Sequence, residues 1–153
     1  MSTFTLDISN ETDFRLDSGP LRAVAEKICN AEMPGGECEI GLLICDDATI
    51  RKYNLLYRGD DQMTDVLCFN LSDTLPSDIT KGNQAVICDI LIDIKQLERQ
   101  KGHKSIQQEL MEIFIHGLLH GFGYDHIRTE ARIQMIEKEK YYKELMEGTQ
   151  QSG

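Results

Sequence analysis

The sequence predicts a single α+β or α/β domain built around a sheet of about four strands. Short apolar runs that are typical of strands alternate with longer stretches whose apolar residues recur at helical spacing. The chain has 153 residues, 41% hydrophobic and 27% charged, a composition that suits one globular domain with a buried core. Neither a repeat nor a linker-like stretch divides it. We therefore expect residues 1–153 to form one domain.

The first half of the chain predicts a strand, a helix, a strand and a helix. Apolar and polar residues alternate over residues 4–9, as in a half-buried strand. A helix begins near Pro20, with apolar positions at helical spacing: Leu21, Val24, Ala25 and Ile28. Residues 33–36 predict a turn, and the short apolar run 40–45 predicts a buried strand. Asp46 or Asp47 can cap the next helix, whose apolar and aromatic positions are Ile50, Tyr53, Leu56 and Tyr57.

The second half predicts two strands followed by three helices. Strands are expected at 66–69 and 85–92, separated by a loop at 72–84 that is rich in Ser, Asp, Pro, Gly and Asn. A short helix follows at 94–100. Ser105 then opens a capping box with Gln108, and the helix behind it is apolar almost all round from 113 to 119, so it should be central and buried. It ends at Gly121 and Gly123, and a last helix covers about 129–146.

Charge and cysteine content exclude several functions. A net charge of −10 argues against a protein that coats nucleic acid non-specifically, although a local basic groove is compatible with it. Five cysteines without a CxxC pair predict reduced thiols rather than a disulfide framework. The chain start is unlike a signal peptide, and no apolar window is long enough for a membrane span. We therefore expect a cytoplasmic protein that does not bind membranes.

Three of the four histidines fall within eleven residues, at the spacing H-x3-H-x5-H. His116 and His120 are four apart on the predicted helix and so lie on one face, and the glycines after them let the chain bring His126 back. Two imidazoles on a buried helix need polar partners, and one shared metal ion would be a partner for both rings. The sequence thus predicts a zinc ion held by three histidines, with a fourth position open for water.

The neighbours of these histidines favour some functions over others. Gly117 stands where zinc proteases carry the glutamate that acts as general base, which counts against peptide hydrolysis. Glu112 either supports a histidine from one turn away or is an acid near the helix N-terminus, and we favour the second interpretation. Asp125 either orients a ligand imidazole or stabilises a turn. Tyr124 either stacks on a base or packs, and we favour packing.

Residues 116–126 match H-G-x-L-H-x-x-G-Y-D-H, so the chain resembles the YbeY family of bacterial endoribonucleases and rRNA maturation factors. Residues 56–58, 64–67 and Phe69 match a second family stretch, and Asp89-Ile90 a third. The resemblance implies a mixed sheet with a central metal-bearing helix, similar to zincins. It also implies a metal-dependent endoribonuclease that cleaves single-stranded RNA, matures ribosomal RNA at the small-subunit 3′ end and serves ribosome quality control.

The resemblance assigns partners and residues as well. It implies one Zn²⁺ per chain on His116, His120 and His126, with RNA and the ribosome or its proteins as partners. Arg58 matches the family's functional arginine, and a guanidinium suits the charge that builds on phosphoryl oxygens. Other cations either line an RNA groove or belong to solvated helix faces, the interpretation we favour for any single lysine: Arg51, Lys52, Lys95, Arg99, Lys101, His103 and Lys104.

Several positions depart from the family pattern. Gly121 replaces a usual Leu, Cys88 a usual Gly, Cys68 a common Ser, and Met63 and Asn70 common prolines. Cys68 and Cys88 lie in strand-like runs, so we interpret them as buried thiols rather than metal ligands. Two other functions remain open: a different zinc hydrolase, such as a peptidase or amidase, and a ribosome-assembly factor with a structural metal.

Overall fold

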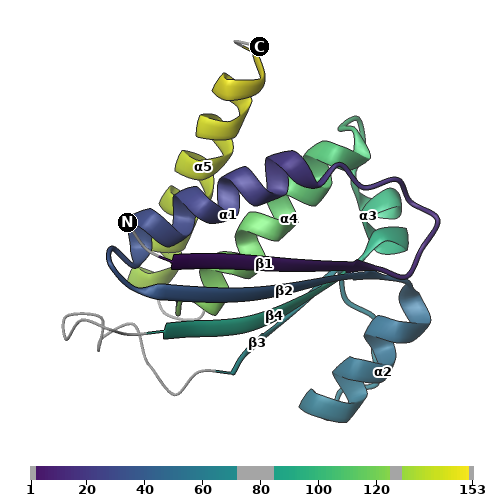
Figure 1. The fold of residues 1–153 in the computed structure, drawn as a ribbon. Coiled ribbons are helices and arrows are strands. Elements are labelled where there is room, and N and C mark those ends of the chain that lie inside the picture. Colours follow the sequence, from purple (N-terminus) through teal and green to yellow (C-terminus); the bar gives the residue numbers. More distant parts are fainter. Residues whose placement is uncertain (1–2, 72–84, 125–128, 152–153) are drawn as a thin grey trace.

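The computed structural model describes residues 3–71, 85–124 and 129–151 (Figure 1). The loop predicted at 72–84 lies outside these residues, as do Asp125 and His126. The elements in chain order are β1 (Thr3–Asn10), α1 (Ser18–Glu32), β2 (Glu37–Cys45), α2 (Asp47–Arg58), β3 (Val66–Asn70), β4 (Ala85–Asp93), α3 (Ile94–Gln100), α4 (Ile106–Gly121) and α5 (Thr129–Gln151).

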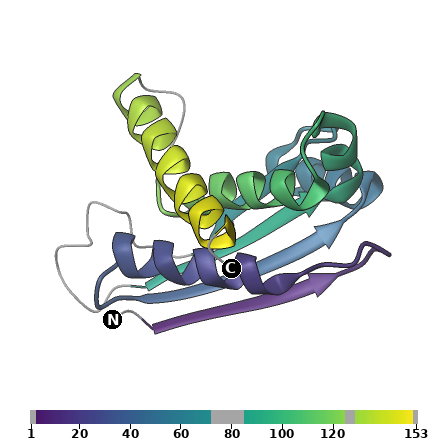
Figure 2. The same cartoon turned by 90° about the horizontal axis from the view of Figure 1, so that it is seen from above.

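The four strands form one mixed sheet in the order β1-β2-β4-β3. β1, β2 and β4 run parallel, and β3 pairs antiparallel with β4 at the edge of the sheet. Figure 1 shows α1, α4 and α5 on one side of the sheet and α2 on the other. Figure 2 shows α1 and α4 lying along that side, with α5 crossing over them. The α+β fold class with a four-stranded mixed sheet is therefore confirmed.

The core lies between the sheet, α1 and α4. Phe114, Leu118 and Leu119 of α4 are fully buried, and they pack with buried residues of α1 and of the strands. Each such side chain removed from water stabilises the fold by about 1.5–3 kcal/mol. The capping box is also confirmed, since Ser105 Oγ accepts from the Gln108 N–H and Gln108 Oε1 accepts from the Ser105 N–H. The predicted central, buried helix is thus α4.

The structure differs from the predictions at element ends and on α2. β2 begins at Glu37 rather than residue 40, because it pairs with both β1 and β4 from that point. α5 continues through Gly148 to Gln151, and no proline follows residue 146 to stop it. On α2, Ile50 and Asn54 are the buried positions, whereas Tyr57 is 62% exposed. α2 therefore leaves Tyr57 largely in solvent, whereas Tyr53 is half-buried.

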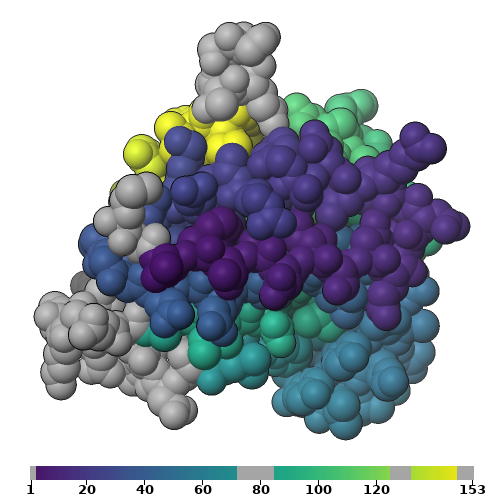
Figure 3. Space-filling model, in the orientation of Figure 1, coloured from purple at the N-terminus to yellow at the C-terminus, as the bar shows by residue number. Residues whose placement is uncertain are grey.

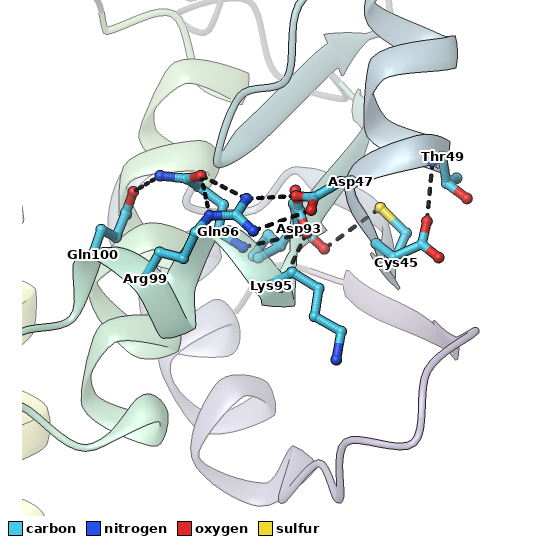
Figure 4. A network of polar contacts seen from close by, with 10 residues as sticks. Cys45, Asp47, Thr49, Asp93, Lys95, Gln96, Arg99 and Gln100 are labelled. Atoms are coloured by element: carbon cyan, nitrogen blue, oxygen red, sulfur yellow. Dashed lines mark hydrogen bonds and ion pairs between the residues drawn. The ribbon is translucent and has the colours of Figure 1, made fainter.

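A pair of acids, one of them buried, joins β4, α2 and α3 (Figure 4). Asp93 is fully buried, and its Oδ1 caps α3 by accepting from the Lys95 and Gln96 N–H groups. Its other oxygen has no donor among the described residues and faces the Asp47 carboxyl, which Arg99 holds with two hydrogen bonds. Burial and the Asp47 charge raise the pKa of Asp93 to about 7. Arg99 and Asp93 lower the pKa of Asp47 to about 2.

The Asp93 pKa predicts a stability loss between about pH 4 and pH 7. The folded protein holds the Asp93 proton up to about pH 7, while the unfolded chain releases it near 3.8. Stability is therefore fully present below pH 4, falls as the pH rises to 7, and is level above. The Asp93→Asn variant keeps the cap and a donor towards Asp47 without titrating. Between pH 4 and pH 8 we expect the free energy of unfolding of this variant to rise by about 4 kcal/mol relative to that of wild type, which corresponds to the difference between a pKa of about 7 and one of 3.8. Urea titrations across this range measure it, and parallel curves for the two proteins would contradict it.

Candidate active site

Two histidines lie together near the C-terminal end of α4. The ring centroids of His116 and His120 are 4.7 Å apart and the ring planes meet at 73°. The proximity of the two rings follows from their spacing in the sequence, since side chains four residues apart in a helix share a face. The His116 side chain is 26% exposed, whereas Ile115 and Leu119 beside it are buried. An apolar helix thus presents two imidazoles where solvent can reach at least one.

Glu139 of α5 supports the histidine pair. Its Oε1 lies 3.0 Å from His116 Nδ1, the distance of a hydrogen bond. A neutral imidazole that donates from Nδ1 has the lone pair of Nε2 left for a ligand. Sequence spacing gave no signal for Glu139, because the contact depends on how α5 packs across α4. The structure also decides between the two interpretations of Glu112, which forms ion pairs with Lys104 and Lys143 rather than supporting a histidine.

The chain that leaves α4 is tied to two other helices. Tyr124 donates from its hydroxyl to Glu32 of α1 at 2.7 Å, and Tyr142 of α5 donates to the other oxygen at 2.8 Å. Burial and the Glu32 carboxylate raise the pKa of Tyr124, so its hydroxyl stays protonated and donating. Tyr124 therefore packs, as we predicted, and its backbone position is fixed. His126 follows two residues later, outside the described residues.

Only part of the predicted metal set can be compared with the structure. Within 3–71, 85–124 and 129–151, no group of three His, Cys, Asp or Glu side chains could hold a metal ion. The described residues do supply two neighbouring imidazoles, the donors that zinc prefers alongside thiolate, and a carboxylate bonded to one of them. This donor set fits zinc once a third ligand joins it, and His126 remains the predicted third ligand.

Arg58 reaches the edge of the sheet from the opposite face. It ends α2, donates from Nη2 to the backbone oxygen of Cys68 at 3.1 Å, and lies with Cζ 5.8 Å from the Phe69 ring centroid. β3, the strand that carries Cys68 and Phe69, also contacts α4, because the Asn70 amide donates to the Gly121 carbonyl at 2.8 Å. β3 thus connects Arg58 with the end of the histidine helix. One hydrogen bond uses one of five guanidinium N–H groups, which leaves others for a ligand.

Three of the other predicted cations have acidic partners. Arg99 binds Asp47, and Arg51 binds Asp61. Lys104 binds both Glu109 and Glu112. The hydrogen bonds that Lys104 donates to these glutamates raise its pKa, so it stays charged and bound to them. These three residues therefore fit the interpretation that they belong to solvated helix faces. Arg58 has no such acidic partner among the described residues and is the stronger candidate for binding phosphate.

Two departures from the family pattern compensate one another. A Cβ at Gly121 would lie 3.0 Å from Cys88 Sγ and 3.4 Å from Cys68 Sγ. The Cys88 thiol is fully buried and fills the space that a side chain at 121 would take. All five cysteines are free, as predicted. A glycine on the helix therefore accommodates a cysteine on the strand beneath it.

Gly121→Leu alone should destabilise the fold by about 1–3 kcal/mol, because the new side chain collides with Cys88 in a packed core. Adding Cys88→Gly should recover at least about 1 kcal/mol relative to the sum of the two single changes. Urea unfolding of wild type, both single variants and the double variant measures this coupling. Strictly additive effects would show that the two positions do not share the space.

The fold and the site define a class of protein: a single α+β domain with an H-x3-H pair at the end of a buried helix, beside a sheet edge that carries an arginine. A family model described as Endoribonuclease YbeY matches residues 7–147. The chain belongs to the YbeY family of endoribonucleases, enzymes that hydrolyse RNA. No helix in the described residues is long and apolar enough to cross a membrane.

Individual relatives agree with this assignment. Endoribonuclease YbeY of Pelotomaculum thermopropionicum is 38% identical over 126 residues, which cover 80% of this chain and 82% of the relative. That of Petrotoga mobilis is 32% identical over 146 residues, 92% of this chain and 95% of the relative. The solution structure of TM1509 from Thermotoga maritima superposes with a TM-score of 0.62 at 26% identity, covering 97% of this chain and 93% of that one.

Proposed function

We propose that this protein is a zinc-dependent endoribonuclease that cleaves single-stranded RNA. We propose ribosomal RNA, at the small-subunit 3′ end, as its substrate, with roles in ribosome maturation and quality control in the cytoplasm. The ribosome or its proteins are the proposed partners. Family membership supports RNA hydrolysis, and the observation that carries the metal assignment is the His116–His120 pair with Glu139 bonded to one ring.

The proposed ligands are His116, His120 and His126, with one zinc ion per chain. When bound, zinc would supply Lewis acidity towards water and a phosphoryl oxygen. Glu139 would hold His116 in the tautomer whose Nε2 can coordinate. Arg58 would bind the equatorial phosphoryl oxygens, which gain negative charge as the phosphodiester is cleaved. The Asn70 amide would keep β3, and hence Arg58, in register with the end of α4.

A peptidase on the same scaffold is the weaker alternative. Position 117 faces the sheet, where a Cβ would lie 3.1 Å from Ile90 Cγ2 and 3.2 Å from Val66 Cγ2. The glutamate that zinc proteases use at this place would thus be forced into the buried interface between α4 and the sheet, away from water. The close packing of Gly117 against the sheet therefore leaves no room for a glutamate at this position.

Cleavage of matched single-stranded and double-stranded RNA tests the proposal. We expect the zinc-loaded protein to cut single strands, to lose the activity when a chelator removes the metal, and to regain it when zinc is returned. Cutting that survives metal removal would contradict the zinc role. No cutting by zinc-loaded protein, together with a metal closed by four protein ligands, would favour the assembly factor with a structural metal.

Removing the Glu139 carboxylate should weaken zinc binding by about 10–100-fold, because His116 then loses the acceptor that orients its ring. Competition with a chromophoric chelator measures the affinity of the Glu139→Ala variant without reference to catalysis. Glu112→Ala is the matched control, because that acid pairs with Lys104 and Lys143. An equal loss of affinity in both variants would show a general charge effect rather than a positioning role for Glu139.

A further inference from the structure

Three aromatic rings continue the surface on which Arg58 lies. Tyr53 and Tyr57 stack with centroids 5.9 Å apart and planes within 6°. The ring centroids of Tyr57 and Phe69 of β3 are 5.1 Å apart, and the Arg58 guanidinium lies over that same Phe69 ring. The sequence did not reveal this series of contacts, because Phe69 reaches it from a different element. We call Tyr53, Tyr57 and Phe69 the aromatic row.

The aromatic row borders a groove on the α2 side of the sheet, the side opposite the histidine pair. The groove has a volume of about 540 Å³, within the range of small-molecule and nucleotide sites. Leu71 also lines it, as do the acidic residues Asp7 and Asp89. The Asp89 carboxylate lies over Gly41, in the space that a side chain there would need. Figure 3 shows α2 in blue at the lower right, with teal residues of the last strands exposed beside it.

We propose that the aromatic row is a stacking site for bases of a single-stranded RNA, an inference that rests on the proposed function. Tyr57 is 62% exposed, so its ring is available to a base. Every base has a π-face, and stacking on exposed aromatic rings binds single strands without strict sequence preference. An RNA strand that reaches Arg58 from the histidine pair would pass around the edge of β3 and meet the aromatic row next.

Charge orients a strand in this groove. Arg58, which lies over the Phe69 ring, attracts phosphate, whereas the carboxylates of Asp7 and Asp89 in the groove repel it. These carboxylates accept hydrogen bonds, and the amino groups of bases donate them. Bases would thus face the groove while the backbone stays on the Arg58 side. A basic protein segment would also be attracted to the acids, but Arg58 would repel it.

A tryptophan reporter tests this directly, because the chain contains no tryptophan. The Tyr57→Trp variant is titrated with a 2′-O-methyl decanucleotide, a single strand that resists hydrolysis. We expect saturable quenching of the indole emission by base stacking, and weaker quenching by the duplex of the same sequence. Tyr141→Trp on α5 is the matched control, since Tyr141 is 57% exposed and also contacts a tyrosine, yet lies outside the groove. Its emission should not change.

Kinetics provide a second readout. Tyr57→Ala should raise KM for single-stranded RNA about tenfold with little change in kcat, whereas Tyr57→Phe should resemble wild type. Thermal melting checks the fold, which should be unaffected because Tyr57 is largely exposed.

The outcomes separate this proposal from the proposed function. If wild type cleaves RNA while Tyr57→Ala keeps its KM and the decanucleotide fails to quench, the stacking site is wrong and the nuclease stands. Quenching by a lysine- and arginine-rich peptide but not by the decanucleotide would overturn the RNA assignment in favour of a protein partner. If wild type does not cleave, the reporter titration alone decides whether the groove binds single strands.

Discussion

Replacing His120 with alanine should lower RNA cleavage by about a thousand-fold or more and abolish stoichiometric zinc binding. His120 faces His116 across 4.7 Å, so the variant would leave one imidazole of this pair. Losing several kcal/mol of Lewis-acid stabilisation corresponds to at least three powers of ten in rate. The fold should survive, because the buried residues around it, Leu118, Leu119 and Phe122, are unchanged.

Zinc content, cleavage rate and thermal melting should be measured together for this variant. His103→Ala is the matched control, since His103 is the one histidine outside the H-x3-H-x5-H cluster and is exposed. That variant should behave as wild type in all three. Cleavage that persists in His120→Ala after zinc is lost would mean that the metal does not take part in the chemistry.

Arg58→Ala should reduce kcat/KM for single-stranded RNA by about 10²–10³-fold with zinc content unchanged. The magnitude follows from removing one preorganised donor group that faces developing charge. Arg58→Lys should recover only part of the loss, because an ammonium is a compact charge without the planar fork that pairs side by side with two phosphoryl oxygens. Arg51→Ala tests specificity on the same helix, because Arg51 is ion-paired with Asp61, and it should change kcat/KM less than about twofold.

Two results would contradict the role of Arg58. Equal losses in Arg58→Ala and Arg51→Ala would indicate a general effect of positive charge on α2. A loss of zinc in Arg58→Ala would indicate that the arginine acts by holding the site together, through the bond to Cys68 and the contact of β3 with α4.

The predictable parts of this molecule are those governed by short-range rules. The histidine pair follows from helical periodicity, and the start of α4 follows from the Ser105 and Gln108 types alone. The mixed sheet was expected from family resemblance rather than from residue patterns. Periodicity recognises strands but carries no information on the order or direction in which they pair.

The missed parts depend on contacts between distant segments. Glu139 reaches His116 across 23 positions in the chain, and nothing in its surroundings distinguishes it from the other acids of α5. The aromatic row requires α2 to lie against β3. Gly121 and Cys88 looked like two unrelated departures until the structure placed the thiol beside the glycine. Such reciprocal changes can be interpreted only in three dimensions.

The antiparallel pairing of β3 has a consequence for what can attach to this sheet. The Asp65 carbonyl accepts from the Asp93 N–H, and the Leu71 N–H donates to the Ile87 carbonyl. The residues Val66 and Cys68, which alternate with this series, therefore direct their carbonyls outward. An outer strand with such groups unsatisfied invites another chain to add to the sheet. Here Thr64 donates to the Val66 carbonyl and Arg58 to that of Cys68. The protein's own side chains thus occupy the positions through which an extended peptide, or a second molecule, would extend the sheet by strand addition.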